Sequence, residues 1–97
     1  MLTGKQRTYL KSLAADLRPT VVIGKNGITD NIYQELRNNL KARELVKVDI
    51  QKGSPLDPRE TANKLARDVN AEFVQAIGRK FVLYKENPES PKITLPR

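Results

Sequence analysis

The sequence contains no cysteine, no histidine and no tryptophan. Without cysteine, the protein has no disulfide framework, no thiolate nucleophile and no thiolate metal site. Without histidine, it lacks the commonest general base and the commonest zinc ligand. The serines have no histidine to activate them, and the acidic residues are scattered along the chain. We therefore expect neither an enzyme nor a protein that holds a cofactor or a metal.

Long hydrophobic runs are also absent. No apolar stretch approaches the roughly 20 residues that cross a bilayer. The basic start MLTGKQRTYL is not followed by the apolar region of a signal peptide. We expect a soluble, cytoplasmic monomer with no membrane partner and no small-molecule substrate.

Positive charge is what the chain has in excess. Its 97 residues include 18 Lys and Arg against 11 Asp and Glu, a formal net charge of +7. A single basic domain of this size suggests a polyanionic partner, a nucleic acid first and an acidic membrane surface second. The excess is uneven, because residues 1–52 carry ten cations and five acids whereas residues 53–97 carry eight and six.

Hydrophobic spacing predicts alternating helices and strands. The first helix covers residues 5–18, where apolar residues recur at three- and four-residue spacing, and Pro19 marks its end. Thr3 is placed to cap this helix, and two further helices begin at the caps Thr29 and Asp57. The predicted strands cover residues 20–23, 45–51, 73–77 and 81–84.

The strands differ in their patterns. The first is an unbroken apolar run, so we expect it to be covered on both faces. The second alternates apolar and polar residues, which indicates one dry and one wet face. The last two are joined by Gly78-Arg79-Lys80, a short link typical of a hairpin.

This order, α-β-α-β-α-β-β, predicts a two-layer α/β (α+β) fold in which helices pack on a small mixed sheet. The strand-helix-strand crossovers make part of the sheet parallel, and the final hairpin makes part of it antiparallel. Residues 1–86 form the single domain. Residues 87–97 include three prolines, and we expect a tail that is loose or laid against the surface.

The loop Gly24-Lys25-Asn26-Gly27 is the sharpest local feature. Two glycines allow a ligand to approach the backbone closely, and the loop leads into a helix N-terminus, whose free N–H groups attract phosphate. The loop is too short for a Walker phosphate loop. An ordinary turn between a strand and a helix is the alternative interpretation.

Basic residues elsewhere extend this candidate site. We expect the cations of the first helix, the GKNG loop and the last hairpin to share one face, because clustered charges sum where scattered ones are screened. The few aromatic residues fit core positions, so base stacking is not expected to dominate. The candidate RNA-binding residues outside the loop are Lys5, Arg7, Lys11, Arg37, Lys41, Gly78, Arg79 and Lys80.

Several segments together resemble the CRM domain, which is named for chloroplast RNA splicing and ribosome maturation. The resemblance covers roughly residues 2–86 with the motifs in family order, which is more specific than one short motif alone. A single domain that nearly fills the chain is similar to the bacterial stand-alone form, the YhbY family. The segments are LTGKQR at 2–7, Arg18-Pro19, IGKNGIT at 23–29, ELVKV at 44–48 and GRKFVLYK at 78–85.

The resemblance implies a four-stranded mixed sheet similar to the C-terminal domain of bacterial translation initiation factor three. It also implies RNA binding and association with precursors of the large ribosomal subunit. The family's RNA-contacting loop corresponds to Gly24–Gly27, and its Gly-Arg segment to Gly78 and Arg79. Arg43 stands where the family often has histidine, which keeps positive charge at that position.

Three functions follow from these observations. The leading one is a non-catalytic protein that binds ribosomal RNA or large-subunit precursors through phosphate contacts, which position a protein without reading sequence. The second is a KH-like binder, in which a GxxG loop between two helices clamps about four single-stranded nucleotides; a helix at residues 20–23 would favour it. The third is a protein-binding adaptor in ribosome assembly, which would show an exposed apolar patch and dispersed cations.

Overall fold

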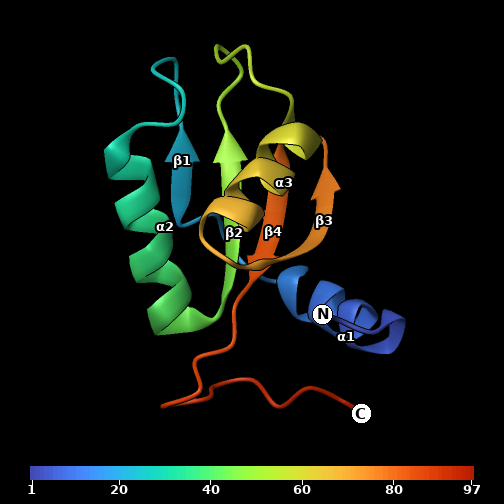
Figure 1. Cartoon of the computed structure of the whole chain (residues 1–97). Coiled ribbons are helices and arrows are strands. Elements are labelled where there is room, and N and C mark those ends of the chain that lie inside the picture. Colours follow the sequence, from blue (N-terminus) through green and yellow to red (C-terminus); the bar gives the residue numbers. More distant parts are fainter.

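Three helices and four strands follow one another in the predicted order. The computed structural model describes residues 1–97, and Figure 1 shows the helices arranged around one sheet. The elements are α1 (Gly4–Ala14), β1 (Val21–Ile23), α2 (Asp30–Arg43), β2 (Leu45–Ile50), α3 (Pro58–Asp68), β3 (Glu72–Ile77) and β4 (Lys80–Tyr84).

The four strands form one mixed sheet in the order β1-β2-β4-β3. β1 runs parallel to β2, with Val21 beside Val48. β4 is antiparallel to both β2 and β3. The predicted combination of a parallel crossover and an antiparallel hairpin is confirmed, and so is the four-stranded sheet that the CRM resemblance implies.

The predicted caps begin all three helices. The Thr3 hydroxyl accepts from the Gln6 N–H at 3.1 Å, and the Gln6 side chain accepts from the Thr3 N–H at 3.0 Å, a reciprocal capping box. Thr29 and Asp57 accept in the same way at the starts of α2 and α3, and Pro58 fills the first turn of α3. Local chemistry therefore fixes where each helix starts.

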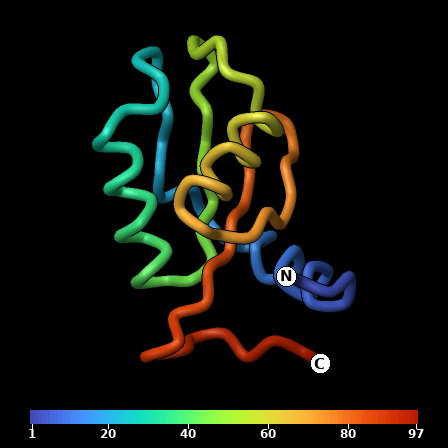
Figure 2. The backbone as a smooth tube through the Cα atoms, viewed as in Figure 1, coloured from blue at the N-terminus to red at the C-terminus, as the bar shows by residue number.

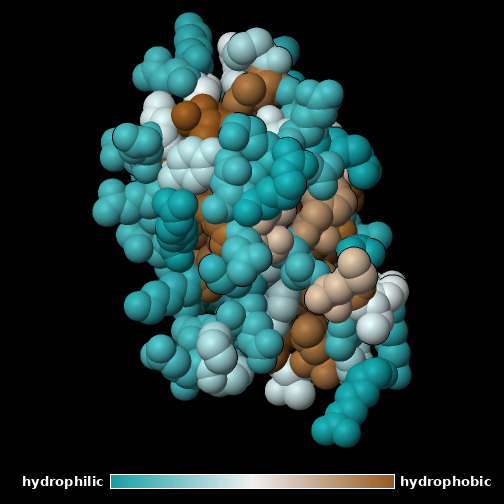
Figure 3. All heavy atoms as spheres, viewed as in Figure 1, coloured by the Kyte–Doolittle hydropathy of each residue, from teal (hydrophilic) through white to brown (hydrophobic).

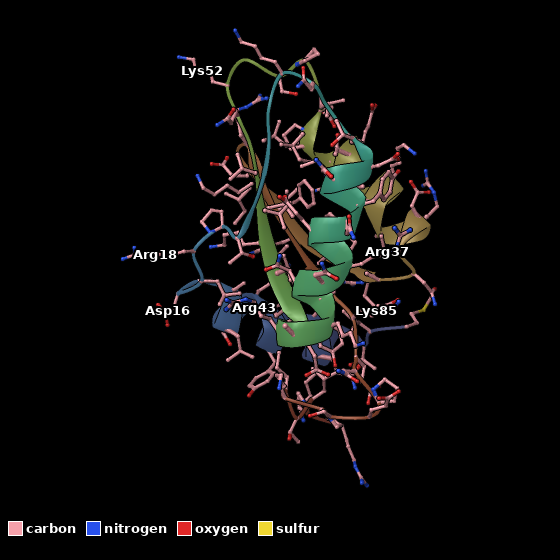
Figure 4. The ribbon with its side chains drawn as sticks, turned by 90° about the vertical axis from the view of Figure 1, so that its left-hand side faces the viewer. Asp16, Arg18, Arg37, Arg43, Lys52 and Lys85 are labelled. Atoms are coloured by element: carbon pink, nitrogen blue, oxygen red, sulfur yellow. The ribbon has the colours of Figure 1, made fainter.

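The two faces of the sheet are covered differently. One face packs on α2 and α3 around a core that includes Phe81 and Leu83 of β4. The other face packs on α1, which contacts the alternate residues Val82 and Tyr84. α1 covers only the lower end of this second face (Figures 1 and 4), so it lies outside the two predicted layers and leaves part of the sheet open.

Two local predictions are wrong. α1 ends at Ala14 instead of reaching Arg18; Leu17 lies in the following turn, where it is still half-buried against the second core. The strand at 20–23 is not covered on both faces, since Val22 is 45% exposed. β1 is an edge strand, and the only helix on that side of the sheet does not reach Val22.

A bulge in β3 changes which side chains face the core. Phe73 pairs with Leu83 and Gln75 pairs with Val82, which leaves Val74 as the extra residue. Strict alternation would put Phe73 and Ala76 on opposite faces. With the bulge, both pack against the core beneath α2 and α3, while Val74 is buried on the α1 side.

Residues 87–97 contain no helix or strand, but they make specific contacts. The tail passes beneath the sheet towards α1 (Figure 2), where Gln6 Nε2 donates to the Pro96 carbonyl at 3.1 Å. Ile93 and Leu95 are half-buried against the second core. The tail is therefore laid against the surface, and the division of the chain at residue 86 stays a prediction.

No helix in the structure combines the length and the hydrophobicity that crossing a membrane requires.

Candidate nucleic-acid interface

Three connections meet at one end of the sheet. Because β1 and β2 are parallel, the loops that follow them leave from the same edge, and the β3–β4 turn reaches that edge because β4 is antiparallel to β2. Figure 2 shows the first two loops rising side by side. We call residues 24–29, 51–57 and 78–79 the loop end.

The GKNG loop is a tight turn with an exposed tip. The Gly27 N–H donates to the Gly24 carbonyl at 3.1 Å, and the Gln51 N–H donates to the Ile23 carbonyl at 2.8 Å, which fixes the base of the loop to the end of β2. Gly27 has φ +72°, a conformation that favours glycine. Lys25 and Asn26 are both exposed between the two glycines.

The side chain of Lys25 lies against the neighbouring loop. A β-carbon on Gly53 would be only 3.3 Å from the Cε atom of Lys25. Lys52, next in this loop, is exposed and projects at the top of the molecule (Figure 4). Lys52 is absent from the predicted site, although its place at the start of the Lys-Gly-Ser-Pro turn could have identified it.

Arg79 has a different role from Lys25, because it binds the protein's own backbone. Its Nε donates to the Ile50 carbonyl at 3.0 Å, and its Nη2 donates to the carbonyls of Gln51 at 3.2 Å and Ser54 at 3.0 Å. Gly78, with φ +59°, opens the tight hairpin turn that aims Arg79 at these oxygens. Arg79 therefore holds the 51–57 loop in place.

The start of α2 is less open to an anion than the sequence suggests. Thr29 Oγ1 accepts from the Ile32 N–H at 3.3 Å, and the Tyr33 N–H donates to the Thr29 carbonyl. Asp30 places a carboxylate in the first turn, where a phosphate would otherwise benefit from the helix dipole. At this end, the exposed tip of the GKNG loop is therefore less obstructed than the start of α2.

Two cations of α1, Arg7 and Lys11, lie beside strand β3. Lys5 is exposed, while Arg7 is half-buried and donates from Nε to the Phe73 carbonyl at 3.3 Å. Lys11 lines a hollow together with Lys80 of β4. The first helix and the hairpin therefore meet at this hollow, but the GKNG loop does not line it, so a single face for all three groups of cations stays a prediction.

Arg37 and Lys41 lie on the other side of the molecule. The guanidinium of Arg37 is 5.5 Å from the centre of the Tyr33 ring, and the Tyr33 hydroxyl donates to Asp68 of α3. Lys41 borders a hollow of about 280 Å³ with Lys85. Figure 4 shows Arg37 on the opposite side from Arg18 and Lys52, so the structure does not bring these two cations to the loop end.

Almost none of the positive charge is neutralised within the protein. Among the lysines and arginines, only Lys64 forms an ion pair, with Asp68 at 2.9 Å. The hydrogen bond to Asp68 raises the pKa of Lys64, and the same bond together with that from Tyr33 lowers the pKa of Asp68. Both lie on α3, where hydrophilic side chains cover the surface (Figure 3). The cations of the loop end have no acidic partner.

The one fully buried carboxylate is that of Glu44, and its oxygens are already hydrogen-bonded within the protein. It accepts backbone N–H groups from Asn87 at 2.7 Å, Lys92 at 2.7 Å and Ile93 at 2.8 Å. Burial acts to raise the pKa of Glu44, but these donors and the charge of Lys92 outweigh it and hold the pKa below its ordinary value. A carboxylate saturated in this way serves structure instead of acid–base chemistry.

Comparison with known proteins shows that this chain is similar to a described domain family and to several named proteins. The family model described as the CRS1 / YhbY (CRM) domain matches residues 2–85. The probable RNA-binding protein YqeI of Bacillus subtilis is 41% identical over 96 residues, covering 99% of this chain and 100% of that protein. An RNA-binding protein of Haemophilus influenzae is 38% identical over 99% of this chain and 96% of its own length.

A solved structure agrees with the fold. The solution structure of a hypothetical Staphylococcus aureus protein, described as a candidate RNA-binding protein, superposes with a TM-score of 0.83. The two chains are 42% identical, and the match covers 99% of this chain and 100% of the other.

Proposed function

The chain belongs to the CRS1 / YhbY (CRM) domain family, and we propose that it is a non-catalytic RNA-binding protein that acts in assembly of the large ribosomal subunit. Relatives that match along almost the whole chain are named RNA-binding proteins. The observation that carries the proposal is the loop end, where the exposed Lys25 and Lys52, which form no ion pair, lie at and beside a turn bounded by two glycines.

In this proposal, Lys25 and Asn26 contact phosphate oxygens at the tip of the GKNG loop, and Gly24 and Gly27 allow close approach. Arg79 acts mainly by holding the 51–57 loop, which carries Lys52 beside Lys25. The contacts are with the backbone of the RNA, so recognition depends on RNA shape more than on a short sequence. The remaining predicted cations extend the electropositive surface: Lys5, Arg7 and Lys11 on α1, Lys80 after the hairpin, and Arg37 and Lys41 on the far side.

The KH-like alternative is not favoured by the geometry. A KH-type GxxG loop joins two helices, whereas residues 21–23 precede the GKNG loop as strand β1. The adaptor alternative would show an exposed apolar patch and dispersed cations, and the protein does expose Val22 and Ile77 and does carry Arg37 and Lys41 away from the loop end. RNA binding is favoured over it because the relatives that match along almost the whole chain are named RNA-binding proteins.

A salt titration tests the RNA-binding proposal. Affinity for a structured fragment of ribosomal RNA is measured from low to physiological salt. If phosphate contacts carry the binding, the logarithm of the affinity falls linearly with the logarithm of salt concentration. Binding that does not change over this range would contradict the electrostatic mechanism.

The assembly role needs a separate experiment. The tagged protein is crosslinked in cells, particles are separated by sedimentation, and the crosslinked nucleotides are mapped. We expect the crosslinks in large-subunit precursors and not in mature subunits. Crosslinks confined to messenger or transfer RNA would contradict an assembly role while leaving RNA binding intact.

A further inference from the structure

The open part of the sheet carries a hollow that the loop end does not explain. Its volume is about 480 Å³, and it lies between the end of α1 and the start of β4. Lys11 comes from α1, Lys47 from β2 and Lys80 from β4, so three separate elements bring a lysine to one place. The other residues around it are Ala15, Gln75, Ile77 and Val82.

The charge of this hollow is positive and unneutralised. None of its three lysines forms an ion pair, and no acidic residue lines it. Asp49 is the nearest acid in the sheet by register, since it pairs with Lys80 of β4 and Val22 of β1. One carboxylate against three ammonium groups leaves a site that favours an anionic ligand.

The same face also exposes apolar side chains. Ile77 is 68% exposed and Val22 is 45% exposed. They are two of only four large hydrophobic residues on the surface of the protein. The open face therefore combines exposed aliphatic side chains on its two edge strands with the lysines of the strands between them.

This combination distinguishes between forms of nucleic acid. An RNA duplex presents phosphates, hydroxyls and a shallow groove, and its base faces are stacked inside. Unpaired nucleotides expose base faces and ribose beside each phosphate, so they can cover apolar side chains and meet lysines at once.

We propose that the hollow on the open sheet face binds an unpaired RNA segment that adjoins the structured RNA held at the loop end. This inference rests on the proposed RNA-binding function and adds a second contact to it. Lys47 and Ile77 are its distinguishing residues, because neither lies at the loop end. Lys80 directly follows the hairpin turn at Gly78 and Arg79, so it lies between the loop end and the hollow.

Two RNA probes separate the hollow from the loop end. One is a blunt RNA hairpin, and the other is the same hairpin with a single-stranded uridine extension of about six nucleotides, a length within the range of single-strand binding sites. The variants are Lys47→Gln, Ile77→Ser and both together. Arg67→Gln, on the exposed surface of α3, removes the same charge as Lys47→Gln and serves as the matched control.

We expect the double variant to weaken binding of the extended hairpin about tenfold, because it removes one phosphate contact and one apolar contact. The blunt hairpin should change no more than it does for Arg67→Gln. In addition, an oligouridine of the same length should shift the amide resonances of Lys47 and Ile77 in the wild-type protein. Equal losses of affinity for both RNAs would overturn the assignment, because the hollow would then contribute only non-specific electrostatic attraction.

No loss on either RNA would also overturn the assignment and leave the open face to a protein partner. If the wild-type protein binds neither hairpin, the RNA-binding function itself fails. That outcome is distinct from a failure of the hollow alone, in which the blunt and extended hairpins bind equally well. Because Ile77 is exposed and Lys47 is only half-buried and forms no ion pair, both variants should fold.

Discussion

At opposite ends of the sheet, one charged side chain donates hydrogen bonds to backbone carbonyls and another accepts hydrogen bonds from backbone N–H groups. At the loop end, Arg79 donates to the backbone carbonyls of residues 50, 51 and 54. At the other end, the Glu44 carboxylate accepts from the backbone N–H groups of residues 87, 92 and 93. Each side chain organises a segment without regular structure, and each does so through three backbone contacts.

The difference lies in what surrounds each group. Arg79 is half-buried among exposed lysines, and the loop it holds remains open to a ligand. Glu44 is fully buried and the tail closes over it. A net charge read from sequence counts both groups equally, but the Glu44 carboxylate is enclosed, whereas Lys25 and Lys52 stay exposed beside Arg79.

The largest effect is expected at Glu44. Glu44→Ala removes the acceptor of three backbone donors, and the stability of the protein should fall by about 2–4 kcal/mol. The tail can detach and hydrate its N–H groups, which limits the loss. Urea denaturation measures this change, and Glu44→Gln should lose less because its amide oxygen still accepts.

The pH dependence provides a check on the same prediction. The folded-state pKa of Glu44 is lowered from its ordinary value near 4.5. Its stabilisation is therefore complete above that ordinary value and is lost as pH falls through the folded-state pKa. The stability gap between wild type and Glu44→Ala should narrow from pH 7 to pH 3, and a gap of constant size would show that the charge does not matter.

Arg79→Ala is expected to have the next largest effect. It removes a donor from the carbonyls of Ile50, Gln51 and Ser54, of which Gln51 still accepts from the Ser54 N–H, and we expect a loss of about 2–3 kcal/mol in stability. Hydrogen exchange at residues 51–56 should also accelerate. Arg79→Lys should not restore the loop, because one ammonium cannot match the spread of the guanidinium donors. Full stability with reduced RNA binding would instead make Arg79 a direct RNA contact.

Much of the fold could be predicted because its determinants are local. The caps Thr3, Thr29 and Asp57 and the glycine of the last hairpin act over a few residues, and the structure confirms them. The predictions that failed depend on what lies opposite an element. The exposure of Val22 follows from the place of β1 at the edge of the sheet, which its own sequence does not encode.

The candidate site shows the same limit. The glycines and charges of the GKNG loop are visible in the sequence, but the engagement of Arg79 with carbonyls depends on a loop some 25 residues away. The sequence does not indicate that Glu44 is buried and holds the tail, since its partners lie in the tail more than 40 residues later. Sequence identifies which residues are charged, and only the fold shows which charges are already occupied.

The loop tip itself should behave in the opposite way to Arg79. Lys25→Ala with Asn26→Ala should leave the fold intact, because both residues are exposed. RNA affinity should fall by about 1–3 kcal/mol, as expected for one or two charge-assisted hydrogen bonds to phosphate. Fluorescence titration measures the affinity, and circular dichroism verifies the fold.

A matched control for the loop tip is available on α3. Arg67→Ala with Asn63→Ala also removes one positive charge and one amide from exposed positions. Arg59 and Lys64 are poorer choices, since Arg59 lies 5.4 Å from the Phe73 ring and Lys64 pairs with Asp68. Equal losses in the two variants would mean that total charge, and not the GKNG loop, carries the binding.

The smallest effect is expected at Asp68, the second carboxylate with a lowered pKa. Its partners are the side chains of Lys64 and Tyr33, and all three lie at the surface, where water can replace each contact. Asp68→Asn should leave the urea midpoint unchanged within experimental scatter at both pH 7 and pH 3. The carboxylates of Glu44 and Asp68 both have a lowered pKa, but only that of the buried Glu44 should affect the stability of the protein. If Asp68→Asn destabilises the protein as much as Glu44→Ala does, burial does not determine how much a carboxylate contributes to stability, and the explanation given for Glu44 is wrong.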